Sequence, residues 1–226
     1  MFANRDEAGI QLAIKLLDDP LFKPIDRNDC LVLSLFGGGV VVGAAVAQAL
    51  GCAHEVLMVK KISFLHRAEL VLAAVAENDV VILDQQMLRY LHDIGRYLDQ
   101  AIIRTKAKIA SEVETFRHGK IINLQAKTVL LIDDGIVTGE AMKAAIKWAT
   151  SSKRADQPEQ VIAAAPVCSP KAAKELSKLV RLVCLTTSEN VWTVDQFYGE
   201  GKKPGDEEVV SMLTAGARSQ ARHAKE

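Results

Sequence analysis

Two adjacent carboxylates follow a short apolar run near the middle of the chain. Asp133 and Asp134 come directly after Thr128–Ile132 (TVLLI), whose length and apolar character predict a buried strand. The carboxyl end of a strand in an open α/β sheet is where ligands bind. Carboxylates accept hydrogen bonds from sugar hydroxyls and bind divalent cations, whereas they repel phosphate. Asp133 and Asp134 are therefore candidates for binding a ribose diol or for holding a metal ion, directly or indirectly.

A glycine-bearing turn separates these acids from the next predicted helix. Its residues are Gly135, Ile136, Val137, Thr138 and Gly139. Their backbone N–H groups can converge on a phosphate, helped by the positive end of the helix dipole, and the Thr138 hydroxyl can add a hydrogen bond. A bare Asp-Asp-Gly often does no more than end a strand. The apolar run before it and the Thr-Gly that opens a helix after it favour a ribose 5-phosphate site instead.

The segment Thr128–Met142 (TVLLIDDGIVTGEAM) closely resembles the phosphoribosyl pyrophosphate (PRPP) motif of type I phosphoribosyltransferases. In that family, apolar residues precede two acids and a G-x-x-T-G loop. The resemblance implies that Asp133 and Asp134 bind the ribose hydroxyls and that Gly135–Gly139, with Thr138, bind the 5-phosphate. It also implies Mg²⁺ as the cofactor. The expected activity is a glycosyltransferase reaction of nucleotide metabolism, in which the phosphoribosyl group passes to a nitrogen nucleophile, with a nucleobase as the expected acceptor, and pyrophosphate is released.

A second glycine loop follows the predicted strand Cys30–Leu35 (CLVLSL). Gly37, Gly38 and Gly39 lie at the place of the family's pyrophosphate loop, where backbone amides without side chains can approach the phosphates closely. We therefore expect these three glycines to bind PRPP.

A pair of lysines follows the predicted strand Glu55–Val59. The resemblance assigns Lys60 and Lys61 to the pyrophosphate and, with Asp133 and Asp134, to catalysis. Because successive residues of a strand point to opposite faces, only one lysine is expected to reach the leaving group. The implied transition state resembles an oxocarbenium ion, so catalysis depends on electrostatic support for the departing pyrophosphate and on exclusion of water.

Three residues depart from the family pattern. Phe36 stands where related loops commonly carry a polar residue or arginine, Ala141 replaces a frequent hydroxyl, and Glu140 adds a negative charge near the phosphate. These changes make turnover uncertain. They keep open an alternative function, a non-catalytic regulator that senses PRPP or a nucleotide through the same pocket.

The glycines also suggest a dinucleotide-binding oxidoreductase. Gly37, Gly39 and Gly43 give G-x-G-x-x-x-G, which is one residue longer than the dinucleotide fingerprint. Lys60 and Lys61 stand about where an acid would hold the NAD ribose. That function also leaves the two acids and the Thr-Gly turn unexplained, so we reject it.

Apolar runs alternate with amphipathic stretches over most of the chain, which predicts an α/β fold with a central, mainly parallel sheet flanked by helices. Besides the strands given above, we expect strands within 70–83, with a turn at 77–79, and at 161–165 and 180–185. The expected helices are 5–18, 40–50, 140–152, 171–178 and 206–217.

We expect a single phosphoribosyltransferase-like domain over residues 1–226. Within it, residues 85–118 form an inserted helical region of one or two helices, on which Arg104, Lys106 and Lys108 make a basic cluster. Residues 186–226 form a small C-terminal hood and tail. The hood aromatics, which are Trp192, Phe197 and Tyr198, either wall a base site or pin the segment to the core. Two candidate lid residues follow the lysine pair, His66 and Arg67.

Composition narrows the class of protein. The charges of the 28 basic and 28 acidic residues cancel. A net charge of zero argues against a protein that binds nucleic acid over its whole surface. The chain has no apolar run of about 20 residues, so we expect no membrane span, and the N-terminus has no apolar signal core. The four cysteines show no metal spacing and are interpreted as reduced thiols of a cytoplasmic protein. A homodimer is compatible with the apolar content.

Overall fold

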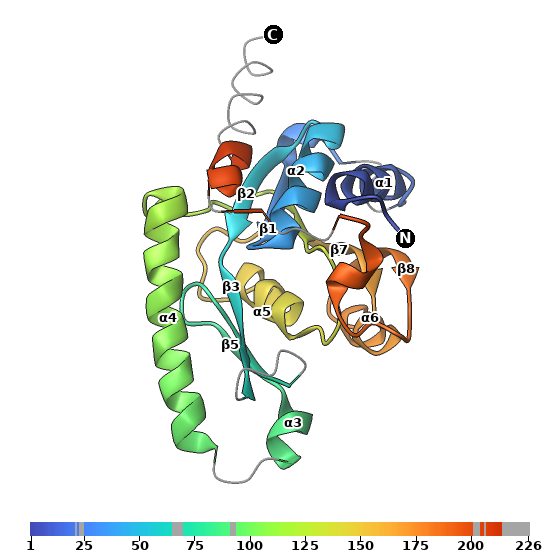
Figure 1. The fold of residues 1–226 in the computed structure, drawn as a ribbon. Helices are drawn as coiled ribbons and strands as arrows, with labels where there is room; N and C mark the ends of the chain where they lie inside the picture. The colour runs from blue at the N-terminus through green and yellow to red at the C-terminus, as the bar shows by residue number, and fades with distance from the viewer. Residues whose placement is uncertain are drawn as a thin grey trace.

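The computed structural model describes residues 1–20, 22, 25–64, 70–90, 94–200, 204–205 and 207–213. At its centre lies a five-stranded sheet in the order β2-β1-β6-β7-β8 (Figure 1). The strands are β1 (Cys30–Leu35), β2 (Ala53–Leu57), β6 (Thr128–Ile132), β7 (Gln160–Cys168) and β8 (Arg181–Thr187). All four neighbouring pairs are parallel, which confirms the predicted central sheet.

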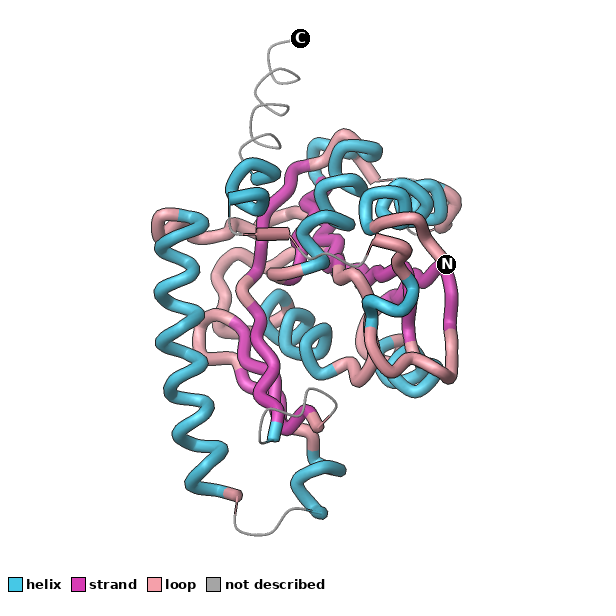
Figure 2. Tube along the Cα trace, in the orientation of Figure 1, coloured by secondary structure: helices cyan, strands magenta, loops and turns pink. Residues whose placement is uncertain are grey.

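Helices cover both faces of this sheet (Figures 1 and 2). One face packs against α1 (Arg5–Leu17) and α2 (Gly38–Leu50), and the other against α5 (Glu140–Ala149) and α6 (Pro170–Leu176). The helix expected at 140–152 is α5, which ends at Ala149, three residues before the predicted end. Gly51, with φ +68°, ends α2 where a left-handed residue is needed.

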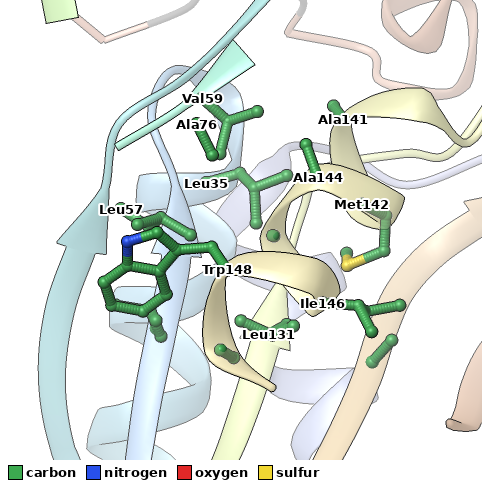
Figure 3. Close-up of a cluster of buried hydrophobic side chains, with 14 of the residues drawn as sticks. Leu35, Leu57, Val59, Ala76, Leu131, Ala141, Met142, Ala144, Ile146 and Trp148 are labelled. Carbon is green, nitrogen blue, oxygen red and sulfur yellow. The ribbon is translucent and has the colours of Figure 1, made fainter. Parts of the chain in front are cut away.

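The strands are buried on both sides because alternate residues enter different cores. In β6, Leu130 and Ile132 pack with α1 and α2, whereas Val129 and Leu131 pack with α5. Figure 3 shows part of the second core, where Leu131 lies beneath α5. This two-sided burial accounts for the continuous apolar runs of the sequence.

The chain leaves the central sheet after β2, and this differs from the sequence prediction. The single strand expected at 55–59 is divided at Met58, whose backbone N–H donates to Glu77 Oε1 at 2.9 Å. Beyond it, β3 (Val59–Ser63), β4 (Val71–Ala76) and β5 (Val81–Leu83) form a separate antiparallel sheet in the order β3-β4-β5. The predicted turn is confirmed, with positive φ at Asn78 and Asp79.

The inserted helical region consists of α3 (Gln85–Tyr90) and α4 (Gly95–Arg117). Figure 1 shows α4 as a long helix at the outer side of the small sheet, with α5 on the other side. In the basic cluster, Lys106 pairs with Asp79 at 2.7 Å, and Arg104 and Lys108 are exposed. The cluster is a solvated face.

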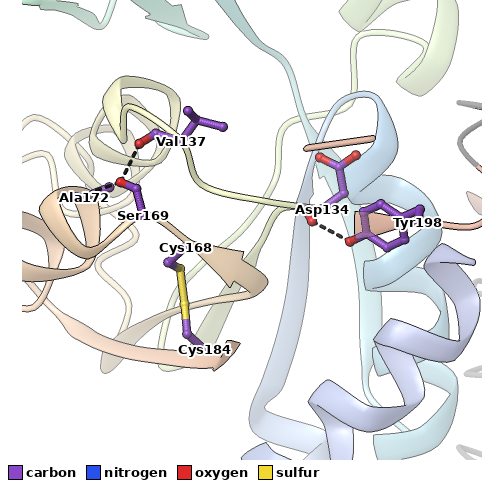
Figure 4. Close-up of a disulfide and its surroundings, with 7 residues drawn as sticks. All are labelled: Asp134, Val137, Cys168, Ser169, Ala172, Cys184 and Tyr198. Atoms are coloured by element: carbon purple, nitrogen blue, oxygen red, sulfur yellow. Dashed lines mark hydrogen bonds between the residues drawn. A yellow bond between two sulfur atoms is a disulfide. The ribbon is translucent and has the colours of Figure 1, made fainter. Parts of the chain in front are cut away.

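Two of the four cysteines correct the sequence interpretation. Cys168 and Cys184 form a disulfide between β7 and β8 (Figure 4), whereas Cys30 and Cys52 are buried free thiols. Spacing along the chain did not predict the disulfide because the parallel pairing of two strands brings its cysteines together. In the described part of the chain, no helix is long and apolar enough to cross a membrane. The boundaries of the single expected domain stay a prediction.

Candidate functional site

The two acids lie just beyond the carboxyl end of β6, as the sequence predicts. The Asp133 backbone N–H donates to Ala164 on β7 at 3.3 Å, which extends the sheet by one residue. The next amide, that of Asp134, donates to Asp133 Oδ1 at 2.9 Å. The strand therefore ends in a turn that places both carboxylates at the edge of the sheet.

The environments of the two acids differ. Asp134 is buried and pairs with Arg5 at 2.8 Å, while Asp133 is partly exposed. Desolvation, together with the negative charge of Asp134, raises the pKa of the Asp133 carboxyl from 3.8 to about 8, and Lys61 opposes this shift. At neutral pH, this shift favours the protonated form of the Asp133 carboxyl.

The loop 135–139, which the sequence predicts to bind a phosphate, is fixed to β7 and to the start of α6. The Ile136 amide donates to Val167 O and the Ser169 amide donates to Ile136 O, both at 2.8 Å. The Ser169 hydroxyl also donates to Val137 O at 2.6 Å (Figure 4). The Ile136 N–H is already used in its hydrogen bond to Val167 O. An anion at this loop would therefore have to bind to the other backbone N–H groups.

Thr138 and Gly139 form the end of that loop. Gly139 has φ +91° and directly precedes α5, so its backbone conformation is one that side chains strongly disfavour. The Thr138 Oγ1 atom is buried and has no hydrogen-bond partner. A buried hydroxyl without a partner is costly, and a ligand that offered it an acceptor would remove that cost.

The first turn of α5 explains two departures from the family pattern. Ala141 is 6% exposed and belongs to the core beneath α5, where a hydroxyl would need a partner. Glu140 is buried and bonded to Lys143 at 3.2 Å, and Lys143 also reaches Glu175 at 2.6 Å. The lysine thus neutralises the extra acid beside the loop.

The glycine loop packs directly on the two-acid turn. A Cβ on Gly38 would lie 1.8 Å from Asp134 Oδ2, and one on Gly39 would lie 3.2 Å from Asp133 Oδ1. Gly37 has φ +116° and open space beside it. The structure thus brings together the two glycine-bearing segments that the sequence singled out.

The two lysines of β3 lie on opposite faces of the small sheet. Lys60 pairs with Glu112 of α4 at 2.9 Å and lies 5.1 Å from the centre of the Phe36 ring. Lys61, the next residue, acts electrostatically on Asp133. Of the pair, Lys61 is therefore the lysine on the side of the acids.

Phe36 has a structural role. Its ring lies 5.0 Å from that of Phe116 on α4, and its N–H donates to Leu57 O at 3.1 Å. Phe36 adds no charge to the glycine loop, but its ring anchors α4 beside that loop.

Two of the three hood aromatics follow the second sequence interpretation, in which they pin the segment to the core. Tyr198 is buried and Phe197 packs in the same cluster with Phe2, so both pin the segment to the core. Trp192 is 81% exposed. The candidate lid residues His66 and Arg67 lie outside the described residues.

Sequence reasoning missed Arg5, which is buried at the first residue of α1 and contacts both Asp134 and Asp195. A charged residue beside the apolar positions of a predicted helix was the available signal. Its partners, 129 and 190 residues away, could not be read from the pattern.

A hollow of about 830 Å³ lies elsewhere, beside the edge strand β2. It is lined by α2, β2 and residues 121–123 together with Arg27 and Lys127, and not by the two acids or the loop 135–139. This hollow is therefore separate from the two acids. We place the candidate site at the acids because only there, among the described residues, do the carboxylates and the unpartnered hydroxyl occur together.

This chain belongs to the phosphoribosyl transferase domain family, whose model matches residues 4–199. It is 30% identical over 215 residues to the Mycobacterium tuberculosis H37Rv protein named "Putative phosphoribosyl transferase Rv0571c", and the match covers 94% of this chain and 46% of the relative. The chain thus spans about half the length of the curated relatives it matches.

Two solved structures are similar to this chain in fold. The crystal structure of TT1426 from Thermus thermophilus has a TM-score of 0.72 and 30% identity, with coverage of 95% of this chain and 98% of that one. AQ2163 from Aquifex aeolicus, at 11% identity, a TM-score of 0.50 and coverage of 81% and 74%, shows similarity of fold alone.

Proposed function

We propose that this protein binds PRPP and transfers its phosphoribosyl group to a nitrogen nucleophile, with a nucleobase as the acceptor. The main support is the unpartnered Thr138 hydroxyl, which lies buried at the entrance to α5 in the same turn as Asp133 and Asp134. Phosphate needs donors and a ribose diol needs acceptors, and this one turn supplies both.

The proposed reaction forms a bond between the acceptor nitrogen and C1 of the ribose, and it breaks the bond between C1 and pyrophosphate. Asp133 accepts hydrogen bonds from the ribose hydroxyls, and the amides near Gly37 face the pyrophosphate. Lys61 adds positive charge on the same side. These groups stabilise the charges that separate in the transition state.

The acids also fit the proposed Mg²⁺ cofactor. No cluster of three or more potential metal ligands occurs within the described ranges, so a cage made only of protein groups is not available there. Mg²⁺ commonly binds through one or two carboxylates, substrate phosphates and water. Asp133, partly exposed beside Asp134, matches that donor set, and bound Mg²⁺ would neutralise pyrophosphate oxygens.

A second candidate function is a non-catalytic sensor of PRPP or a nucleotide. It is favoured by Lys60, which is paired with Glu112, and by Phe36, which contributes no charge. The ion pair of Lys60 and the uncharged side chain of Phe36 both leave less positive charge available to a leaving pyrophosphate. For either function, we also propose that the protein is cytoplasmic and forms a homodimer.

Pyrophosphate release distinguishes these functions. The purified protein would be incubated with PRPP, Mg²⁺ and single nucleobases, with PRPP binding measured in parallel by titration calorimetry. Release that depends on one base supports the transferase. Binding without release supports the sensor, and a protein that binds no PRPP contradicts both.

A further inference from the structure

Resting on the proposed function, we propose that Arg5 is a positioning residue that gives the two adjacent acids different roles. It holds Asp134 as an internal anchor and leaves Asp133 as the carboxylate that binds the ribose diol.

The contacts of Arg5 fix Asp134 in one position. Both Nε and Nη2 of Arg5 lie 2.8 Å from Asp134 Oδ2. The exposed fractions of the two residues are 2% and 7%. A buried ion pair with two contacts to one oxygen leaves that carboxylate little freedom to turn toward a ligand.

The same guanidinium also binds the hood. It pairs with Asp195 and lies 4.6 Å from the centre of the Tyr198 ring, while the Tyr198 hydroxyl donates to the backbone oxygen of Asp134 at 2.5 Å (Figure 4). The Phe2 amide donates to Phe197 O at 2.8 Å, so the N-terminus and the hood are joined directly before α1 begins.

The glycine loop closes the remaining side. The position where a Cβ of Gly38 would stand is 1.8 Å from Asp134 Oδ2 and 2.6 Å from Arg5 Nε. Only a residue without a side chain fits against this ion pair. Asp134 is thereby enclosed by α1, the glycine loop and the hood, whereas Asp133 stays partly exposed.

Charge gives Arg5 an effect on ligand binding. Asp134 directly follows Asp133 and, without Arg5, would be a buried charge with no described cationic partner of its own. Loss of one partner of a buried pair is strongly destabilising, and the freed carboxylate would add negative charge beside a ligand that carries several phosphates.

The test measures PRPP affinity in the presence of Mg²⁺ by titration calorimetry. For Arg5→Met we expect a Kd at least about 10-fold above wild type, since an uncompensated charge is left at the site. The double variant Arg5→Met/Asp134→Asn removes that charge and should return the Kd to within about 3-fold of wild type. Arg5→Lys should bind better than Arg5→Met, because it keeps the charge but loses the second contact.

Arg117→Met is the matched control, since Arg117 is also buried and pairs with a buried acid, Glu77, away from the site. It should lower the melting temperature and leave the Kd for PRPP unchanged. If Arg5→Met does not fold, Arg5→Lys and the double variant still give the comparison.

The outcomes separate this inference from the proposed function. A wild-type protein that binds no PRPP contradicts the function itself. If the wild type binds and Arg5→Met binds equally well, only the role of Arg5 is wrong. If Asp134→Asn weakens binding as much as Asp133→Asn and the double variant shows no recovery, Asp134 contacts the ligand and the division of roles is overturned.

Discussion

At the scale of single residues, the candidate site places a carboxylate where its charge is unfavourable. The pKa of Asp133 is raised because desolvation and the neighbouring Asp134 disfavour its ionised form. A group with a raised pKa in the folded state stabilises the fold fully below its unfolded pKa and loses that contribution as pH rises through the folded pKa. Asp133 is thus a residue whose expected function costs stability.

We predict that Asp133→Asn is more stable than wild type at alkaline pH, although it binds PRPP weakly. The stability difference should grow between about pH 4 and pH 8 and then level off, because the unfolded chain ionises Asp133 at the lower end of that range and the folded protein at the upper end. Urea unfolding of the protein without ligand, in EDTA, measures it. A constant difference across this range would contradict the raised pKa.

The sequence predicted the site only where its residues are neighbours along the chain. Asp133 to Gly139 could be read together because one turn holds them all. Arg5 and Asp195 could not be assigned, since their contacts depend on how α1 and the hood fold onto β6. The sequence also could not separate Lys60 from Lys61, because that needs the faces of β3.

At the scale of elements, the glycine loop and the two-acid turn are packed with no space between them. We predict that Gly38→Ala destabilises the protein by about 1–3 kcal/mol or more, because its Cβ would overlap Asp134 and Arg5. PRPP affinity should fall as well, since both acids would shift.

Gly95→Ala is the control for this variant. Gly95 is also the first residue of a helix, α4, and a Cβ there has nothing within 4 Å. Alanine at this position should be neutral or slightly stabilising. Thermal unfolding of both variants gives the comparison, and equal melting temperatures would show that the loop has room to move.

Most elements were predictable from apolar periodicity, and the failures have physical causes. The 55–59 strand was divided because Glu77, on the small sheet's turn, bonds Met58 and draws the chain out of the central sheet. The apolar sequence of residues 55–59 does not by itself indicate that the chain leaves the central sheet at Met58. The Cys168–Cys184 disulfide was missed for a similar reason, because neighbouring strands create the contact.

At the scale of the whole molecule, we expect the stability of the fold at acidic pH to depend on His54, a residue of β2 that faces α2. His54 is buried against Ser34, whose hydroxyl oxygen lies 2.7 Å from the histidine Nε2, and burial lowers the pKa of His54 from 6.5 to about 4. The neutral form therefore stabilises the fold above pH 6.5, and that stabilisation is lost as pH falls toward 4.

We predict that His54→Gln has a smaller loss of stability on acidification than wild type. The histidine alone should account for roughly 3 kcal/mol of the wild-type loss between pH 7 and pH 4, from the difference between its two pKa values. The measurement is chemical unfolding of both proteins at several pH values. Parallel curves for the two proteins would show that the pKa of His54 is the same in the folded and unfolded states.

At this scale the family model covers residues 4–199, and the similarity in fold to the Thermus thermophilus structure extends over 95% of the chain. The curated relative is about twice as long, since the match covers 46% of its length. The activity proposed for this chain therefore has to be tested on the chain itself.

The most direct test of PRPP binding at this turn is the Kd for PRPP, with Mg²⁺, of wild type and Thr138→Val. Valine keeps the volume and removes a buried hydroxyl that has no partner, so stability should be unchanged or higher. If Thr138 donates to the 5-phosphate, the Kd should rise by about 10-fold or more, as expected for losing a hydrogen bond to a charged group. Equal affinities in the two proteins would show that the phosphate does not bind at this turn.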